Sequence, residues 1–81
     1  HSYPSLHNHA IMCTLYVQSI VQENLNSDFT EERVDAAKHL GLLKCSDTMV
    51  IYALKERVKY DEDERVRYES AKSLITLGIL S

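Results

Sequence analysis

Residues 33–40 (RVDAAKHL) and residues 67–74 (RYESAKSL) are two versions of one segment, and they decide the fold. When residue 33 is aligned with residue 67, an Arg, an acidic residue, a small residue, an Ala, a Lys and a Leu coincide, and Leu43 falls on Leu77. Both copies have the three- and four-residue apolar spacing of an amphipathic helix. Internal similarity at a fixed period of this length is typical of repeat architectures. We therefore expect two equivalent helices in one stack.

A second alignment competes with this one. It places residue 32 on residue 64 and matches residues 32–34 (ERV) with residues 64–66 (ERV). The two alignments differ by a shift of two positions, and they cannot both hold within one continuous helix, because such a shift rotates a helix by about 200°. The first alignment keeps the small residues and the leucines facing one way, and we prefer it for that reason.

Composition favours helices along the whole chain. The 81 residues include two glycines and one proline, where average usage would give roughly six and four. A β-sandwich or barrel needs turn residues at many more places. The net charge of −3 lacks the basic excess typical of DNA-binding proteins. No apolar stretch reaches the length of a membrane span, and we expect a piece of a larger protein that begins here at His1.

Helical periodicity predicts three segments. Residues 5–25 form one helix that is apolar nearly all round, residues 28–60 form a pair of helices, and residues 61–78 form a fourth helix. The joints are short, so neighbouring helices should fold back as hairpins. Small side chains should let the helices approach closely. These small residues are Ala36, Ala37, Ser70 and Ala71.

Polar residues at the joints predict the helix ends. Asp28, with Glu31 three residues later, resembles a capping box for the second helix. Ser46 or Asp47 should cap the third helix, and Asp61 should cap the fourth. A glycine, Gly78, follows the fourth helix as a C-cap, and Gly41 stands at a nearly matching place in the earlier copy.

The fourth segment carries a family resemblance. Residues 61–74 (DEDERVRYESAKSL), followed by Gly78, resemble the first helix of a HEAT repeat, most closely the short subtype also found in phycobilin lyases. Residues 36–41 (AAKHLG) resemble a second copy, which departs from the pattern because Glu32 stands where Val is expected before Arg33. The third helix resembles the second helix of such a repeat, and the first helix fits as the last helix of a preceding repeat.

The resemblance implies an all-α fold, an α–α superhelix in which antiparallel helical hairpins stack with a right-handed sense. The chain would supply about four helices of this HEAT-like solenoid, with further repeats of the same protein on either side. The function implied is a non-catalytic scaffold that binds other proteins, within an intracellular, cytoplasmic protein. The alternatives are a nucleic-acid-associated module, which the net charge of −3 disfavours, and an accessory domain of the lyase type.

No residue pattern indicates catalysis, a metal or a cofactor. His7 and His9 are two residues apart, which places them on different sides of a helix, and zinc-ligand spacings are absent. Cys13 lies on the apolar stripe of the first helix and Cys45 in a joint, and we expect both cysteines to be reduced. The carboxylates of residues 61–64 suit a solvated capping turn better than an acid–base pair. We expect no enzyme and no cofactor.

The remaining candidates are surface residues. In HEAT solenoids the second helices of the repeats line the concave side that binds partners. The residues that this implies here are Tyr52, Lys55, Glu56 and Lys59 of the third helix and Gln18 and Gln22 of the first. One interpretation is a basic patch that grips an acidic partner with tyrosines as anchors. Its residues are Lys55, Arg57, Lys59, Arg65 and Arg67, with Tyr52, Tyr60 and Tyr68 among them. The other is an ordinary charged helix face with internal pairs such as Glu56–Lys59 or Glu69–Lys72.

Overall fold

The computed structural model describes residues 15–80. This part of the chain is helical, with the elements η1 (Ile20–Leu25), α2 (Thr30–Leu43), α3 (Thr48–Tyr60) and α4 (Glu64–Thr76). Residues 15–19 are helical and run directly into η1. No strand occurs between residues 15 and 80. For residues 15–80, the prediction of an all-α fold with about four helices is confirmed. The expected start of the first helix, with His7, His9 and Cys13, lies outside the described residues.

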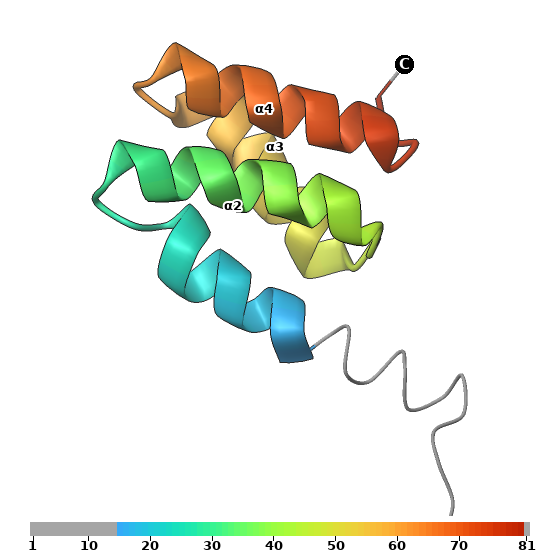
Figure 1. The fold of residues 1–81 in the computed structure, drawn as a ribbon. Coiled ribbons are helices and arrows are strands. Elements are labelled where there is room, and N and C mark those ends of the chain that lie inside the picture. Colours follow the sequence, from blue (N-terminus) through green and yellow to red (C-terminus); the bar gives the residue numbers. More distant parts are fainter. Residues whose placement is uncertain (1–14, 81) are drawn as a thin grey trace, which may run out of the picture.

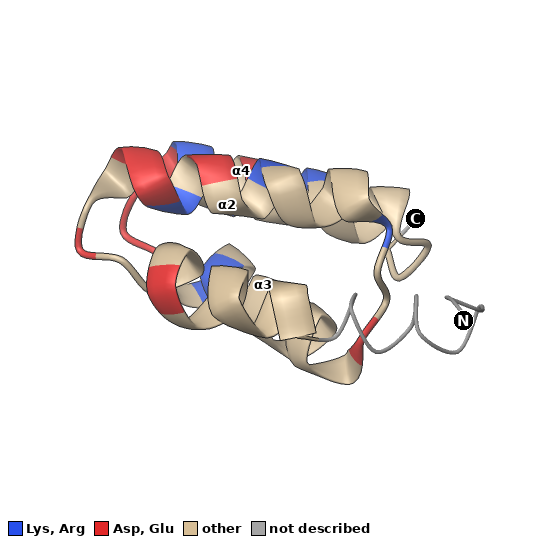
Figure 2. Ribbon diagram, turned by 60° about the horizontal axis from the view of Figure 1, so that its bottom comes forward, with Lys and Arg blue, Asp and Glu red and all other residues tan. Residues whose placement is uncertain are grey.

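The helices form two layers. Helices α2 and α4 lie side by side in one layer, and α3 lies across the core from them (Figure 1 and Figure 2). Helix α4 packs closely against both α2 and α3, and η1 packs mainly against α2 and also against α3. Leucines and valines from all four helices fill the space between the layers. The fully buried ones are Val17, Leu25, Leu40, Val50, Leu54, Val66 and Leu74.

Small residues bring α2 and α4 into close contact. The Ser73 hydroxyl donates a hydrogen bond to the Ala37 carbonyl oxygen. A Cβ atom placed on Gly41 would lie 2.9 Å from Ser73 Cβ and 3.1 Å from Ser73 Cα. Of the predicted small residues, Ala36, Ala37 and Ser70 are buried and Ala71 is half-buried. The close approach is shown at Ala37, and Gly41 and Ser73 are further small residues at this contact.

Helices α2 and α4 begin at equivalent positions of the two aligned copies, and α4 ends one position earlier than α2. Thr30 and Glu64 are their first residues. After the two helices, Lys44 and Gly78 adopt left-handed backbone conformations, with φ of 55° and 82°. Gly78 therefore ends α4 as predicted, since glycine tolerates this conformation. Gly41 does not have the matching role, because it lies inside α2 and serves the close approach of α4.

Asp47 caps α3 as predicted, but the other two caps differ from the prediction. The Asp47 carboxylate accepts a hydrogen bond from the Met49 N–H. No side chain caps α2, where Ser27, not Asp28, accepts from the Phe29 N–H and donates to Glu32.

The cap of α4 is Asp63, whose carboxylate accepts from the Arg65 N–H at 2.8 Å. The expectation for Asp61 was wrong, because its side chain is drawn into a buried ion pair. The acidic turn therefore contains two aspartates with different roles.

The end of the first helix has a form that the periodicity did not predict. Residues 20–25 are a π-helix, whose hydrogen bonds span one more residue than those of an α-helix. Val17, Val21 and Leu25, each four residues apart, are buried in the core. Leu15 and Tyr16 are exposed. The apolar circumference of this helix is thus only partly covered within the described chain.

Cys45 is disulfide-bonded, which corrects the expectation that it is reduced. Disulfides persist mainly in oxidising compartments and are rare in the cytosol, so this feature runs against the expected cytoplasmic location. The other cysteine of the chain, Cys13, lies outside the described residues. Between residues 15 and 80, no helix has the length and apolar character needed to cross a membrane.

Candidate functional site

A groove runs between η1 and α3 and continues to the two connections that lead into α2 and α4. It consists of two adjoining hollows of about 350 and 370 Å³, which share Asn26 and Arg57 in their linings. We call the first the apolar hollow, the second the charged hollow, and the two together the η1–α3 groove.

The apolar hollow lies directly between η1 and α3. Val21, Met49 and Ala53 give it apolar surface, and Gln22, Tyr52 and Glu56 stand around them. Tyr52 is 66% exposed, because it is on the side of α3 that faces away from the core. An apolar depression with polar groups at its edge suits the side chain of a bound protein segment.

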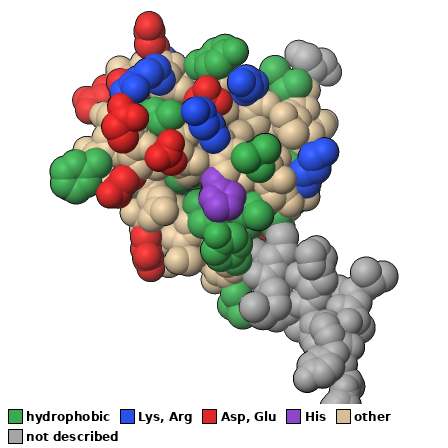
Figure 3. Space-filling model, in the orientation of Figure 1, with side chains coloured by type: hydrophobic (Ala, Val, Ile, Leu, Met, Phe, Trp, Pro, Cys, Tyr) green, Lys and Arg blue, Asp and Glu red, His purple; other side chains and the backbone are tan. Residues whose placement is uncertain are grey.

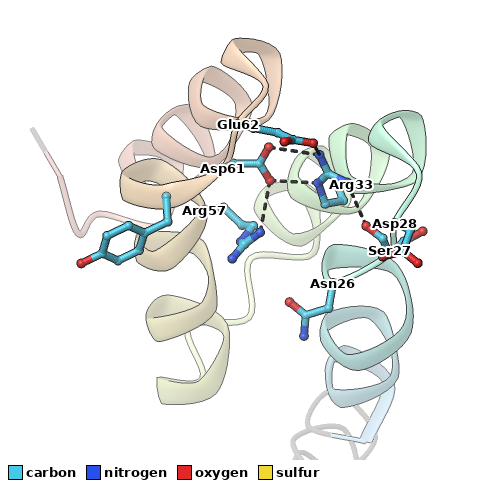
Figure 4. A pocket seen from close by; sticks show the side chains of 8 residues that line it. Asn26, Ser27, Asp28, Arg33, Arg57, Asp61 and Glu62 are labelled. Carbon is cyan, nitrogen blue, oxygen red and sulfur yellow. Dashed lines mark hydrogen bonds and ion pairs between the residues drawn. The ribbon is translucent and has the colours of Figure 1, made fainter.

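The charged hollow is built around a buried aspartate. Arg33 of α2 donates from Nε and Nη2 to the two Asp61 carboxylate oxygens at 2.9 and 3.2 Å, and Arg57 of α3 donates from Nη1 at 3.2 Å. Figure 4 shows the two arginines reaching Asp61 from different helices. The Arg33 and Asp61 side chains are only 7% and 1% exposed. A fork-shaped guanidinium suits this two-point contact with a carboxylate.

Asp61 is held in its ionised form. Burial disfavours the charged carboxylate, but hydrogen bonds from Arg33 and from the Asp63 N–H, together with the charges of Arg33 and Arg57, outweigh burial and lower the pKa of Asp61. The same hydrogen bond to Asp61 raises the pKa of Arg33 against its own desolvation. The pair therefore remains charged over the physiological pH range and joins α2 to the α3–α4 connection.

The two arginines that the sequence alignment matches make the same backbone contact. Arg33 Nη1 donates to the Ser27 carbonyl oxygen at 2.9 Å, and Arg67 Nη1 donates to the Asp61 carbonyl oxygen at 2.7 Å. In each case the acceptor precedes the arginine by six residues. Arginines at equivalent positions of the two copies thus tie the turn before each helix to the helix itself.

The structure brings together three of the six candidate surface residues. Gln22, Tyr52 and Glu56 line the apolar hollow. Lys55 and Lys59 are exposed but line neither hollow, and Gln18 is half-buried outside both linings.

Only one of the two expected ion pairs within a helix is formed among residues 15–80. Lys72 Nζ lies 3.9 Å from a Glu69 carboxylate oxygen. Glu56 and Lys59 do not pair in this part of the chain. The Glu56 carboxylate is therefore left at the edge of the groove.

Sequence reasoning did not assign Asn26 or Asp61 to a binding surface, whereas Arg57 belonged to the expected basic patch. Both hollows are lined by Asn26, which follows η1, and by Arg57. Asp61 lines the charged hollow, where it binds Arg33 (Figure 4). One feature of the sequence could have identified Asp61. It stands six residues before Arg67, just as Ser27 stands six residues before Arg33. No such spacing marks Asn26.

The opposite layer presents a different surface. Figure 3 shows acidic side chains near the start of α2 and α4, with lysines and arginines among them. His39 contacts Tyr16 there, with ring centroids 5.9 Å apart and nearly perpendicular rings. A hollow of about 240 Å³ between α2 and α4 is lined by residues that include Lys38, Leu42, Lys72 and Thr76. No group of three His, Cys, Asp or Glu side chains suited to a metal occurs among residues 15–80.

Comparison with known proteins gives no relative of this chain. No protein-family model, no curated protein and no solved structure matches it.

Proposed function

We propose that this chain is a non-catalytic protein-interaction scaffold, a slice of a HEAT-like solenoid, and that the η1–α3 groove receives a segment of a partner protein. The observation that carries the proposal is the groove itself. It joins an apolar hollow edged by Gln22, Tyr52 and Glu56 to a hollow with hydrogen-bonding side chains and backbone. An exposed tyrosine beside an apolar depression is a common anchor point in protein interfaces.

The relation between α2 and α4 supports the solenoid part of the proposal. The two helices begin at equivalent positions of the aligned copies, are followed by left-handed residues at equivalent positions, and lie side by side. Arg33 of the first copy binds Asp61, which precedes the second copy. One helix pair is thus fastened to the next by a buried contact, which is the nearest-neighbour stacking on which solenoids depend.

Exposed apolar residues on the outer helices support flanking repeats. Leu15, Tyr16 and Ile75 are more than half exposed. A further helix pair packed against these residues would remove them from water, as stacking does in repeat arrays. No feature of the groove favours nucleic acid, because four carboxylates and two arginines are its charged lining residues.

A peptide selection on the full 81-residue chain tests the binding proposal. A random peptide library is panned on the immobilised chain, and the selected peptides are titrated against the wild type and variants. Tyr52→Ala and Ala53→Arg should weaken binding by about tenfold or more, which corresponds to about 1.4 kcal/mol. Tyr68→Ala is the matched control, because Tyr68 is 62% exposed on α4, outside the groove. Circular dichroism shows that each variant is folded.

Two results would contradict the proposal. One is that no peptide is enriched over an unrelated helical protein of similar charge. The other is that the enriched peptides bind Tyr52→Ala and Ala53→Arg as well as the wild type, which would place the interaction elsewhere on the surface.

A further inference from the structure

The charges of the η1–α3 groove indicate the kind of segment that it takes. Two arginines and four carboxylates line the two hollows, which leaves an excess of two negative charges. The positive members are Arg33 and Arg57. The negative members are Asp28, Glu56, Asp61 and Glu62.

Both arginines already have a carboxylate partner. Arg33 and Arg57 share Asp61, and Arg33 also donates to the Ser27 carbonyl oxygen. Glu62 is 89% exposed and its carboxylate lies 4.0 Å from Arg33, at the limit of an ion pair. The carboxylates of Asp28 and Glu56 form no ion pair with any residue between 15 and 80. The charge that remains to be paired in the groove is therefore negative.

Two tyrosine rings at the groove are also open to a cation. Tyr52 stands at the apolar hollow and Tyr60 at the charged hollow, and both are exposed. Within the described chain, Lys72 lies over the Tyr68 ring, 5.4 Å from its centroid, and neither groove tyrosine has such a partner. A lysine or arginine side chain over a tyrosine ring is attracted by the negative face of the ring.

We propose that the η1–α3 groove binds a basic segment of a partner protein, in which an apolar side chain enters the apolar hollow and flanking lysines or arginines meet the carboxylates and the tyrosine rings. This inference rests on the proposed function and specifies the partner. The partner inferred from the structure is basic, whereas one interpretation of the sequence was an acidic partner. The reversal follows because four of the five basic residues on which that idea depended, Lys55, Lys59, Arg65 and Arg67, line neither hollow. The fifth, Arg57, lines both hollows but is paired with Asp61.

Three synthetic peptides test the inference. Each has a central leucine, flanked by arginine and lysine in the basic peptide, by glutamate in the acidic peptide and by serine and glutamine in the neutral peptide. They are titrated against the full chain at low and high salt by fluorescence anisotropy. The basic peptide should bind at least about tenfold more tightly than the acidic one at low salt. The preference should shrink at about 1 M salt, where charges are screened beyond about 3 Å.

A pair of charge-reversal variants locates the effect. Glu56→Lys should weaken binding of the basic peptide by about tenfold. Asp35→Lys makes the same change of charge sign on the exposed side of α2, away from both hollows, and should leave affinity within about twofold. Glu56→Gln, which removes the charge and keeps the shape, should give an intermediate loss.

The outcomes separate the two proposals. One outcome is that the three peptides bind equally, or that the acidic one binds most tightly, while Tyr52→Ala still weakens binding. This outcome would overturn the basic-segment inference but would keep the groove as a binding site. Equal losses in Glu56→Lys and Asp35→Lys would also overturn it, because the effect would then be one of overall charge. Failure of all three peptides and of the peptide selection to bind the groove would overturn both.

Discussion

Arg33 and Asp61 are separated by 28 residues in the chain and meet through two hydrogen bonds of 2.9 and 3.2 Å. Their side chains are almost completely buried, and Arg57 reaches the same carboxylate. The contact joins α2 to the connection between α3 and α4, and it also closes the charged end of the η1–α3 groove. The ion pair therefore belongs both to the buried contacts of the fold and to the lining of the charged hollow.

Removal of the Asp61 charge should destabilise the fold strongly. Asp61→Asn removes the buried carboxylate that Arg33 binds and leaves the exposed Glu62 carboxylate, at 4.0 Å, beside it. Breaking a buried pair in this way costs about 3–5 kcal/mol. For a chain of this size, that is a large part of a total stability of roughly 4–12 kcal/mol. Urea unfolding followed by circular dichroism measures the loss.

The neighbouring aspartate provides the control. Asp63→Asn changes the same chemical group two residues away, but Asn caps a helix about as well as Asp, so the free energy of unfolding should change far less than in Asp61→Asn. Equal losses in the two variants would mean that Asp61 acts as part of a generally acidic turn and not through Arg33.

The stability of the chain should fall at acid pH partly through Asp61. Because the folded-state pKa of Asp61 is lowered, its ionised form stabilises the fold. This stabilisation is complete at pH values above about 3.9, the pKa of an aspartate in the unfolded chain. It is lost as the pH falls through the lower pKa that Asp61 has in the folded protein. The difference in unfolding free energy between wild type and Asp61→Asn should therefore narrow below about pH 4. A difference that stays constant down to about pH 2 would show that ionisation of Asp61 is not linked to folding.

Gly41→Ala should destabilise the protein although alanine is the better helix former. Alanine gains about 1 kcal/mol in helix propensity over glycine. The added Cβ would lie 2.9 Å from Ser73 Cβ, so α2 and α4 must separate, and overpacking of this kind costs roughly 1–3 kcal/mol. The net effect expected at thermal unfolding is a lower midpoint. A raised midpoint would mean that the α2–α4 contact adapts without loss.

Lys44→Gly should stabilise the chain by roughly 0.5–1 kcal/mol. Lys44 has a φ of 55° after the end of α2, a conformation in which a Cβ atom is strained and glycine is not. Lys44→Ala keeps the Cβ and should change stability little. Denaturant unfolding of the two variants separates two effects. Both variants lose the lysine side chain, but only Lys44→Gly relieves the backbone strain, so a gain in both variants alike would contradict the prediction.

The helices themselves were predictable because their signals are local. The spacing of Leu40 and Leu43, the spacing of Leu74 and Leu77, and the glycine at position 78 are each signals within a few positions of the chain. The surface was only partly predictable for the same reason. Helical spacing places Tyr52 and Glu56 on one side of α3, but the pairing with Gln22 depends on how η1 packs.

The role of Asp61 shows where local reasoning fails. Asp61 and Asp63 stand in one acidic turn and both suit a helix cap. Which of them caps α4 is decided by Arg33, a residue of another helix whose guanidinium needs a buried carboxylate. The π-helical form of residues 20–25 is likewise marked by no local sequence signal.

The central claim is that the η1–α3 groove is the binding surface, and backbone-amide NMR during titration with a library-selected peptide tests it most directly. The account predicts that the largest shift changes fall on Gln22, Tyr52 and Ala53, and that Lys38 and Leu42 at the α2–α4 hollow are unaffected. Shift changes centred on Lys38 and Leu42, with Gln22 and Tyr52 unaffected, would contradict it.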